Sequence, residues 1–401
     1  MLQRIQTLNI SITDRKEIQY MAKTKKEITK NLFSRKRLFL AAFLSLLCSS
    51  STACAADVSV GTNAINTPTV MLNKQPFFPF GFYYTSWSDQ DDTKRLLALR
   101  KIADAGFNVI HASLDLNDGQ FVDEAARRGV YIIGEFNDDT MSVINKYKNN
   151  PAIMGWLVAD DADNGKKTAD DILKFHKQVK AADPQRITYL SGGYPSRIGQ
   201  FANTVDVIGM QSYPIGNEPL SSTDYTISTA VKAAAPYNRP VIANLQAFAW
   251  NQKRQPSSKE VRNMTYQALI DGVKGITYYA YHDRHTLNWD MTNYPNLWNG
   301  IKSLVPEIKQ LSPMLLNGNL TKIHTGVYDI FAGMWHYQNQ AVVVVINTSS
   351  STKHVSIALP SQRPSQVKAM FSGRPSGMTV IGNKLSGSIK PKDVHVYSFG
   401  I

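Results

Sequence analysis

The sequence predicts an α/β fold, namely a (β/α)₈ TIM barrel followed by a C-terminal antiparallel β-sandwich domain. Three observations lead to this fold class. Eight short apolar segments alternate with amphipathic helical stretches between residues 76 and 317. Several of these stretches end at a glycine just before the next apolar segment, and a glycine in that place is a helix stop signal. From residue 318 onward the pattern changes to short strands without helices.

The eight apolar segments have the length and composition of buried strands. Strands that alternate with helices form right-handed βαβ units and a parallel sheet, and eight such units between residues 76 and 315 fit a closed barrel. A doubly wound open sheet is the alternative, but it favours a glycine-rich phosphate turn after the first strand, which residues 81–89 (GFYYTSWSD) lack. The predicted strands cover residues 76–84, 108–113, 130–136, 153–159, 186–192, 205–213, 240–248 and 275–281.

Amphipathic periodicity predicts helices between these strands. Residues 297–315 supply the eighth helix, which Pro306 is expected to kink. The clearest of the other helices cover residues 93–106, 122–129, 166–182 and 257–272.

The remaining segments complete the predicted domain organisation. The residues after Asn317 form short strand-like segments separated by turn residues, which is typical of an antiparallel β-sandwich. The expected organisation is an N-terminal extension with a secretory signal peptide at 1–56, a short linker at 57–75, the barrel at 76–317 and the β-sandwich domain at 318–401.

The N-terminal extension has the pattern of a secretory signal. Basic residues between 30 and 37 precede an apolar stretch at 38–47 and then small residues suited to cleavage. The apolar stretch is too short to span a bilayer, so no stable membrane span is expected after cleavage. We therefore expect an exported protein, periplasmic or secreted. Lipidation at Cys54 is the alternative, although Ser51 stands where lipoprotein signals usually carry leucine.

The two cysteines and the charge constrain the rest of the chain. Cys48 and Cys54 both lie in the signal segment, so no disulfide is expected in the mature protein. Met21 is an alternative start to Met1, because residues 1–20 resemble neither a signal nor a folded segment. The formal charge is +13, of which +7 lies in residues 1–56, so +6 remains on the rest. No basic run interleaved with aromatic residues follows residue 56, so we expect no nucleic-acid partner.

Polar and aromatic residues stand at the carboxyl ends of the predicted strands, where barrels of this kind carry their chemistry. Carboxylates and amides bind sugar hydroxyls, and aromatic rings stack on the apolar face of a pyranose. We therefore expect a carbohydrate partner, including an anionic polysaccharide, and a monomer. No paired-cysteine or HExxH spacing occurs, so no metal and no other cofactor is expected. The candidates are Asp160, Asp161, Glu135 and Asp283 for catalysis, and His111, Asp138, Gln211, Tyr213, Gln246, Trp250, Tyr281 and Trp87 for substrate binding.

In this order the motifs resemble those of the clan A glycoside hydrolases, and most closely bacterial barrel members of undefined specificity. The residues that carry the resemblance are 106–111 (GFNVIH), 157–163 (LVADDAD), 206–214 (DVIGMQSYP), 240–248 (PVIANLQAF) and 294–313 (YPNLWNGIKSLVPEIKQLSP). They match strand 2, strand 4, strand 6, strand 7 and the final barrel helix of that clan. The resemblance implies the same fold and the cleavage of glycosidic bonds.

The resemblance also implies roles for three residues. Asp161 takes the position of the general acid/base glutamate, Gln246 that of the strand 7 nucleophile, and Tyr213 that of the tyrosine that commonly touches the nucleophile. Aspartate shortens the reach by one bond of about 1.5 Å, which a loop shift could absorb. Glutamine, in contrast, cannot form the glycosyl ester that a retaining double displacement requires.

These departures leave several hypotheses. In the first, the enzyme inverts, with Asp161 as the acid and Glu135, Asp138 or Asp283 activating water. In the second, a group of the substrate is the nucleophile. In the third, the protein binds glycans without cleaving them, as a binding or envelope-scaffold protein. The leading hypothesis is a glycoside hydrolase in which Asp161 is the general acid and Asp160 binds a hydroxyl or orients its neighbour.

A structural role competes with the catalytic one at the tip of strand 4. The acidic residues there could merely cap the helix that begins near Lys167. Asp163, the third acidic residue of the run, is expected to be solvated.

Overall fold

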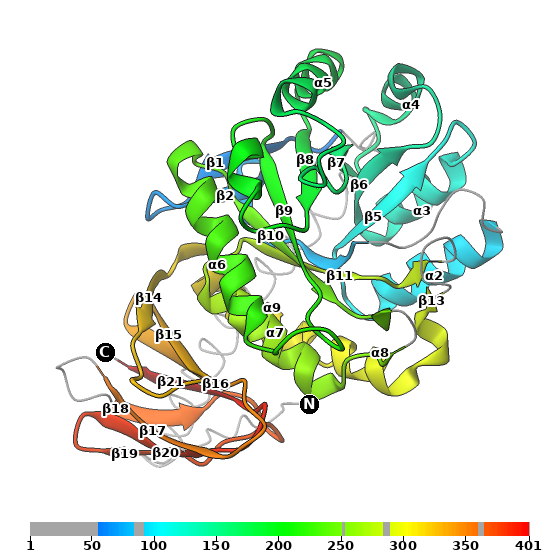
Figure 1. Ribbon diagram of the computed structural model, residues 1–401. Coiled ribbons are helices and arrows are strands. Elements are labelled where there is room, and N and C mark those ends of the chain that lie inside the picture. Colours follow the sequence, from blue (N-terminus) through cyan, green and yellow to red (C-terminus); the bar gives the residue numbers. More distant parts are fainter. Residues whose placement is uncertain (1–54, 84–91, 251–252, 284–288, 360–364, 401) are drawn as a thin grey trace, which may run out of the picture. The chain divides into compact units, whose positions relative to one another are not determined.

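The computed structural model describes residues 55–83, 92–250, 253–283, 289–359 and 365–400 (Figure 1). The predicted signal segment with Cys48 and Cys54, and the candidate residue Trp87, lie outside the described residues.

Eight parallel strands close into a barrel, as the sequence predicts. The last strand, β11, pairs with the first, β4, and each of the other neighbours in the barrel pairs with the next strand along the chain. A barrel closed in this way brings all eight carboxyl ends to one rim. The strands are β4 (Phe80–Phe82), β5 (Val109–Leu114), β6 (Tyr131–Phe136), β7 (Ile153–Ala159), β8 (Ile187–Gly192), β9 (Val207–Ser212), β10 (Val241–Gln246) and β11 (Gly275–Tyr279).

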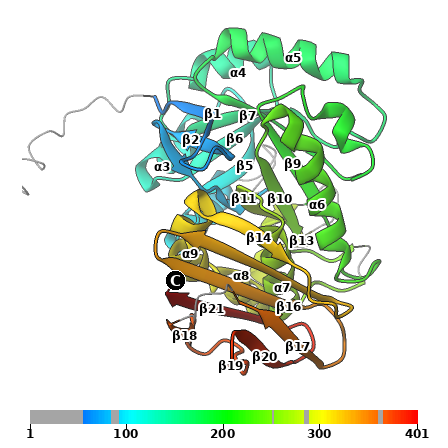
Figure 2. The same cartoon turned by 90° about the vertical axis from the view of Figure 1, so that its left-hand side faces the viewer.

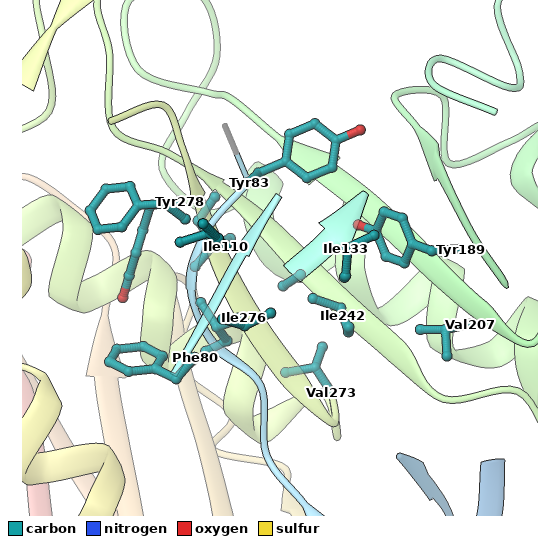
Figure 3. Close-up of a cluster of buried hydrophobic side chains, with 14 of the residues drawn as sticks. Phe80, Tyr83, Ile110, Ile133, Tyr189, Val207, Ile242, Val273, Ile276 and Tyr278 are labelled. Carbon is teal, nitrogen blue, oxygen red and sulfur yellow. The ribbon is translucent and has the colours of Figure 1, made fainter. Parts of the chain in front are cut away.

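Buried side chains from different strands meet in the barrel core. Figure 3 shows Ile110, Ile133, Tyr189 and Ile242, from four different strands, in one cluster with Tyr83. Each of these five side chains is at most 2% exposed. The core therefore holds the strands in register and fixes where their carboxyl ends emerge.

Helices connect the strands around the barrel (Figure 1). The predicted eighth helix is in fact two helices, and Pro306 lies in the first turn of the second, where its missing N–H group costs no hydrogen bond. The proline therefore starts a helix instead of kinking one. The helices are α2 (Asp92–Asp104), α3 (Gly119–Arg128), α4 (Thr140–Tyr147), α5 (Ala169–Ala182), α6 (Ser222–Ala234), α7 (Ser258–Ile270), α8 (Pro295–Lys302) and α9 (Val305–Asn317).

The segment expected to be a linker, residues 57–75, instead contains most of a small antiparallel sheet. Its strands are β1 (Val58–Thr62), β2 (Pro68–Leu72) and β3 (Gln75–Phe77). Val58 and Val70 are almost fully buried in the barrel's hydrophobic core. The N–H of Val58 also donates to the carbonyl of Gln185, beside β8. The linker expectation was wrong because strands of three to five residues are too short to leave a clear periodic pattern in the sequence.

The C-terminal residues form the predicted antiparallel β-sandwich, whose two sheets Figure 2 shows. The larger sheet has the order β14–β15–β16–β21–β18 and the smaller one β17–β20–β19. The strands are β14 (Asn319–Ile323), β15 (Ile330–Tyr337), β16 (Gln340–Asn347), β17 (Lys353–Ala358), β18 (Ser365–Ala369), β19 (Thr379–Ile381), β20 (Lys384–Ile389) and β21 (Val394–Gly400).

Strand β16 joins the two hydrophobic cores. Val343 and Val345 belong to the core of the sandwich, whereas Val342 and Val344 belong to the core that includes the barrel. Successive side chains of a strand point to opposite faces, so a run of consecutive valines can be buried on both. The β-sandwich domain is therefore packed against the barrel through a continuous apolar surface.

Candidate active site

Two adjacent carboxylates emerge directly after strand β7. Asp160 accepts a hydrogen bond of 2.5 Å from the hydroxyl of Tyr83, and the neighbouring Ser191 hydroxyl acts to lower the pKa of Asp160. Asp161 accepts a bond of 2.8 Å from Nε2 of Gln211, which also donates to the Ser191 hydroxyl. The structure thus brings together Asp160, Asp161 and Gln211, all expected at the site, around Ser191.

The backbone of Asp161 has a φ of 45°, in the left-handed region. Aspartate tolerates this region better than most residues. At this turn the chain reaches the surface, since Asp160 and Asp161 are exposed residues whereas the preceding residue, Ala159, is buried.

Glu135, at the end of strand β6, is the third carboxyl group of this cluster. With Asp160 it lines a pocket of about 230 Å³ that also includes Lys167 and Thr140. Burial and the charge of Asp160 raise the pKa of Glu135 to about 7, against the opposing effect of Lys167. Burial and the charge of Asp161 raise the pKa of Asp160 to about 6. Asp160 thus keeps solvent-exposed surface although its carboxyl group is largely surrounded by protein.

His111 and Tyr83 form the inner wall of the cluster. Their rings stack with centroids 4.6 Å apart, and Nε2 of His111 lies 3.8 Å from Oε2 of Glu135. Burial lowers the pKa of His111 to about 4, so the imidazole is neutral near pH 7 and does not neutralise Glu135. Burial and Asp160 raise the pKa of Tyr83 far above its usual value, so its hydroxyl remains a donor.

A group of aromatic residues adjoins the carboxyl cluster. The rings of Tyr213 and Tyr279 stack at 5.7 Å, and Tyr279 lies 5.9 Å from Tyr83. Trp250 packs edge-to-face against Tyr213 at 6.0 Å, and the hydroxyl of Tyr279 donates to Asp283. Three expected site residues, Tyr213, Trp250 and Asp283, are therefore joined through Tyr279, and the aromatic rings of this group provide a surface suited to a sugar face.

Gln246, at the end of β10, does not bond to Tyr213, the contact expected at the nucleophile position, but to backbone groups of the described chain. Gln246 is fully buried, and its side chain bonds to the N–H and the carbonyl of Ile215 and to the carbonyl of Phe248. The β10 side chain that bonds to the Tyr213 hydroxyl is Asn244, whose Nδ2 donates to it at 2.8 Å. Asn244 lies two residues earlier on the same face of β10, and strand alternation could have identified it. Both residues are amides, so neither can act as a carboxylate nucleophile.

The bonding of Gln246 allows a prediction about its replacement by glutamate. Glutamate lacks an N–H donor, so the carbonyls of Ile215 and Phe248 would lose their partner and a carboxylate would be buried. We expect Gln246→Glu to lower the free energy of unfolding by about 2–4 kcal/mol and to create no new turnover. Denaturant unfolding measures this effect, with the exposed Gln310→Glu on α9 as the matched control. Unchanged stability of Gln246→Glu would contradict the structural role.

Three other residues lie away from the carboxyl cluster or have a different role. The carboxylate of Asp138 accepts from the N–H of Leu116, joining two loops at the barrel rim. Tyr281 packs against Phe82 and Trp298 and not against the acidic residues. Asp163, expected to be solvated, is buried and accepts bonds from the N–H groups of residues 193 and 194. Its role is to fix the loop after β8.

Within the described residues, no group of three or more histidine, cysteine, aspartate or glutamate side chains is arranged to hold a metal ion. In the same part of the chain, no helix has both the length and the apolar character needed to cross a membrane.

Comparisons with known proteins show the fold. The sequence matches no protein family and no curated protein. An α-amylase from Anoxybacillus, described as a new glycosyl hydrolase subclass, aligns over 80% of this chain and 97% of its own, with a TM-score of 0.56 and 12% identity. An α-amylase from Geobacillus thermoleovorans, solved with acarbose, gives a TM-score of 0.54 and 14% identity over 80% of this chain and 97% of its own. A GH30 endoxylanase from Clostridium papyrosolvens gives a TM-score of 0.50 and 11% identity over 86% of this chain and 100% of its own. The solved structures that share this fold thus include glycoside hydrolases, as the sequence resemblance indicated.

Proposed function

We propose that this protein cleaves glycosidic bonds of a polysaccharide or oligosaccharide by general acid–base catalysis. The observation that supports the proposal is the cluster of Glu135, Asp160 and Asp161 at the rim of the barrel. Glycoside hydrolysis needs one protonated and one ionised carboxyl group. The raised pKa values of Glu135 and Asp160, about 7 and about 6, supply both forms near neutral pH.

Within this proposal, Glu135 and Asp160 share the proton that is transferred to the leaving oxygen. Asp161, exposed and oriented by Gln211, activates water or binds a hydroxyl. Inversion is favoured over retention because Asn244 and Gln246, the two inward positions near the end of β10, are amides. The sequence-based assignment of the acid to Asp161 is the alternative, and the same variants distinguish the two.

The proposed setting is outside the cytoplasm, in keeping with the signal-like sequence before residue 57. An anchor at Cys54 is the alternative to free release. Labelling with radioactive palmitate and fractionation of the producing cell separate these two outcomes.

A second candidate function is glycan binding without cleavage. The specific observation in its favour is the amide of Asn244 against Tyr213, where the resemblance implies a nucleophile. In this case the carboxyl cluster would bind hydroxyl groups only.

The test is to incubate the mature protein with a panel of bacterial and plant glycans and to assay new reducing ends. We expect Glu135→Gln and Asp160→Asn to lower turnover about 10²- to 10⁴-fold, whereas Asp170→Asn, an exposed change of the same charge on α5, has no effect. Loss of turnover in Asp161→Asn alone would place the acid at Asp161. Unchanged turnover in all three cluster variants would reject the site, and binding without turnover in the wild type would favour the second function.

A further inference from the structure

Two further pockets lie between helices α2 and α8, beside the β12 (His282–Asp283) and β13 (Trp289–Asp290) hairpin. Their volumes are about 360 Å³ and about 230 Å³. They share Lys101, Tyr281 and Thr292 in their walls, so they form one continuous double pocket. None of the residues of the carboxyl cluster lines it.

The aromatic wall of the double pocket is held rigidly by the core. Tyr281 and Trp298 pack edge-to-face with ring centroids 5.5 Å apart. Behind them, Phe82 lies 5.4 Å from Tyr281 and 5.9 Å from Trp298. Trp298 is only partly buried, so it combines a fixed position with accessible ring surface, as sugar-binding rings do.

The polar wall of the double pocket carries uncompensated positive charge. Lys94 and Lys101 on α2 and Lys302 at the end of α8 are exposed and line the two pockets. In the part of the chain that the structure describes, none of the three ammonium groups has a carboxylate within ion-pair distance.

The two carboxylates of the wall are already engaged. Asp104 pairs with Arg128 at 2.6 Å. Asp290 accepts from the N–H and the hydroxyl of Thr292 and lies 3.8 Å from His282. The three lysines therefore have no carboxylate partner in the described part of the wall, and their charge favours an anionic ligand.

We propose that the double pocket is a second carbohydrate site, which binds an anionic glycan. Carboxylate or sulfate groups of the glycan contact Lys94, Lys101 and Lys302, and a sugar ring lies against Trp298, which the buried Tyr281 supports from behind. That the ligand is a carbohydrate rests on the proposed function. That the ligand is anionic rests on the three lysines. The positive charge of +6 outside residues 1–56 favours the same class of ligand.

The experiment measures equilibrium binding of dextran sulfate, oligogalacturonate and uncharged dextran to the intact protein by calorimetry. Dextran sulfate tests sulfate groups, oligogalacturonate tests carboxylates, and dextran is the uncharged counterpart. We expect one or both anionic glycans to bind at least about tenfold more tightly than dextran. The triple variant K94S/K101S/K302S should lose at least about tenfold in affinity, and salt near 0.5 M should weaken the wild type similarly.

Two variants separate a specific site from general attraction to a basic protein. The variant K177S/K309S/K384S removes the same charge from exposed positions elsewhere and should change affinity less than about twofold. Trp298→Leu leaves the charge unchanged and should still weaken binding. Equal losses in the two triple variants, or tight binding in Trp298→Leu once its fold is verified by circular dichroism, would overturn the proposal. Lysine-dependent binding by a protein without turnover would support this site while rejecting the proposed hydrolysis.

Discussion

Replacing Glu307 by alanine is expected to lower the free energy of unfolding by about 3–5 kcal/mol. Glu307 on α9 is 3% exposed and pairs at 3.0 Å with Arg262 on α7, which is 6% exposed. It also accepts a 2.6 Å bond from the Tyr266 hydroxyl and pairs with Arg374. Alanine would leave the buried guanidinium of Arg262 without its counter-ion, and this uncompensated charge dominates the cost.

Chemical denaturation of the variant measures this effect, and Glu218→Ala, at an exposed position, is the control. Arg262 also donates to the carbonyl of Val394 in β21, so the pair lies where the barrel meets the β-sandwich domain. Replacing both charges, as in R262L/E307M, should recover part of the loss because no buried charge then remains unpaired. A loss below about 1 kcal/mol in Glu307→Ala would contradict the assigned role.

The barrel could be predicted because parallel strands buried on both faces appear in sequence as continuous apolar runs. Strand β7, residues 153–159, is such a run and is buried along its whole length. The same reasoning failed for strands β1 and β2, since each is only five residues long and neither is a continuous apolar run. Short strands that pair only with each other leave a weak periodic signal, and the sequence there resembles a linker.

The site could be predicted only in part, for a related reason. Asp160, Asp161 and Glu135 were identifiable because charges at or directly after the ends of buried strands need an explanation. Tyr83 was missed because a tyrosine inside an apolar run resembles a core residue. The role of Gln246 depends on Ile215, 31 residues earlier, and no local pattern reports that contact.

Activity should be confined to a narrow range around pH 6–7 if Glu135 and Asp160 share the catalytic proton. Below the pKa of Asp160, about 6, both groups become protonated, and above that of Glu135, about 7, both become ionised. Because the two groups interact, the acidic and alkaline limbs of the pH–activity profile report apparent pKa values of the pair and not of either residue alone. The charge of Asp160 contributes to the raised pKa of Glu135, so Asp160→Asn should move the alkaline limb of its residual activity to lower pH. An unmoved limb in that variant would contradict the coupling.

Stability against pH provides a readout of Glu135 that needs no substrate. The folded-state pKa of Glu135, about 7, lies above the ordinary value of 4.5, so folding favours the protonated form. The stability gained from this preference is present below about pH 4.5 and is lost as the pH rises towards 7. Glu135→Gln has no such titration, so its stability relative to the wild type should rise by up to about 3 kcal/mol between pH 4.5 and 8. A constant difference across this range would mean that Glu135 ionises normally in the folded protein, and the proton required by the mechanism would have to reside elsewhere.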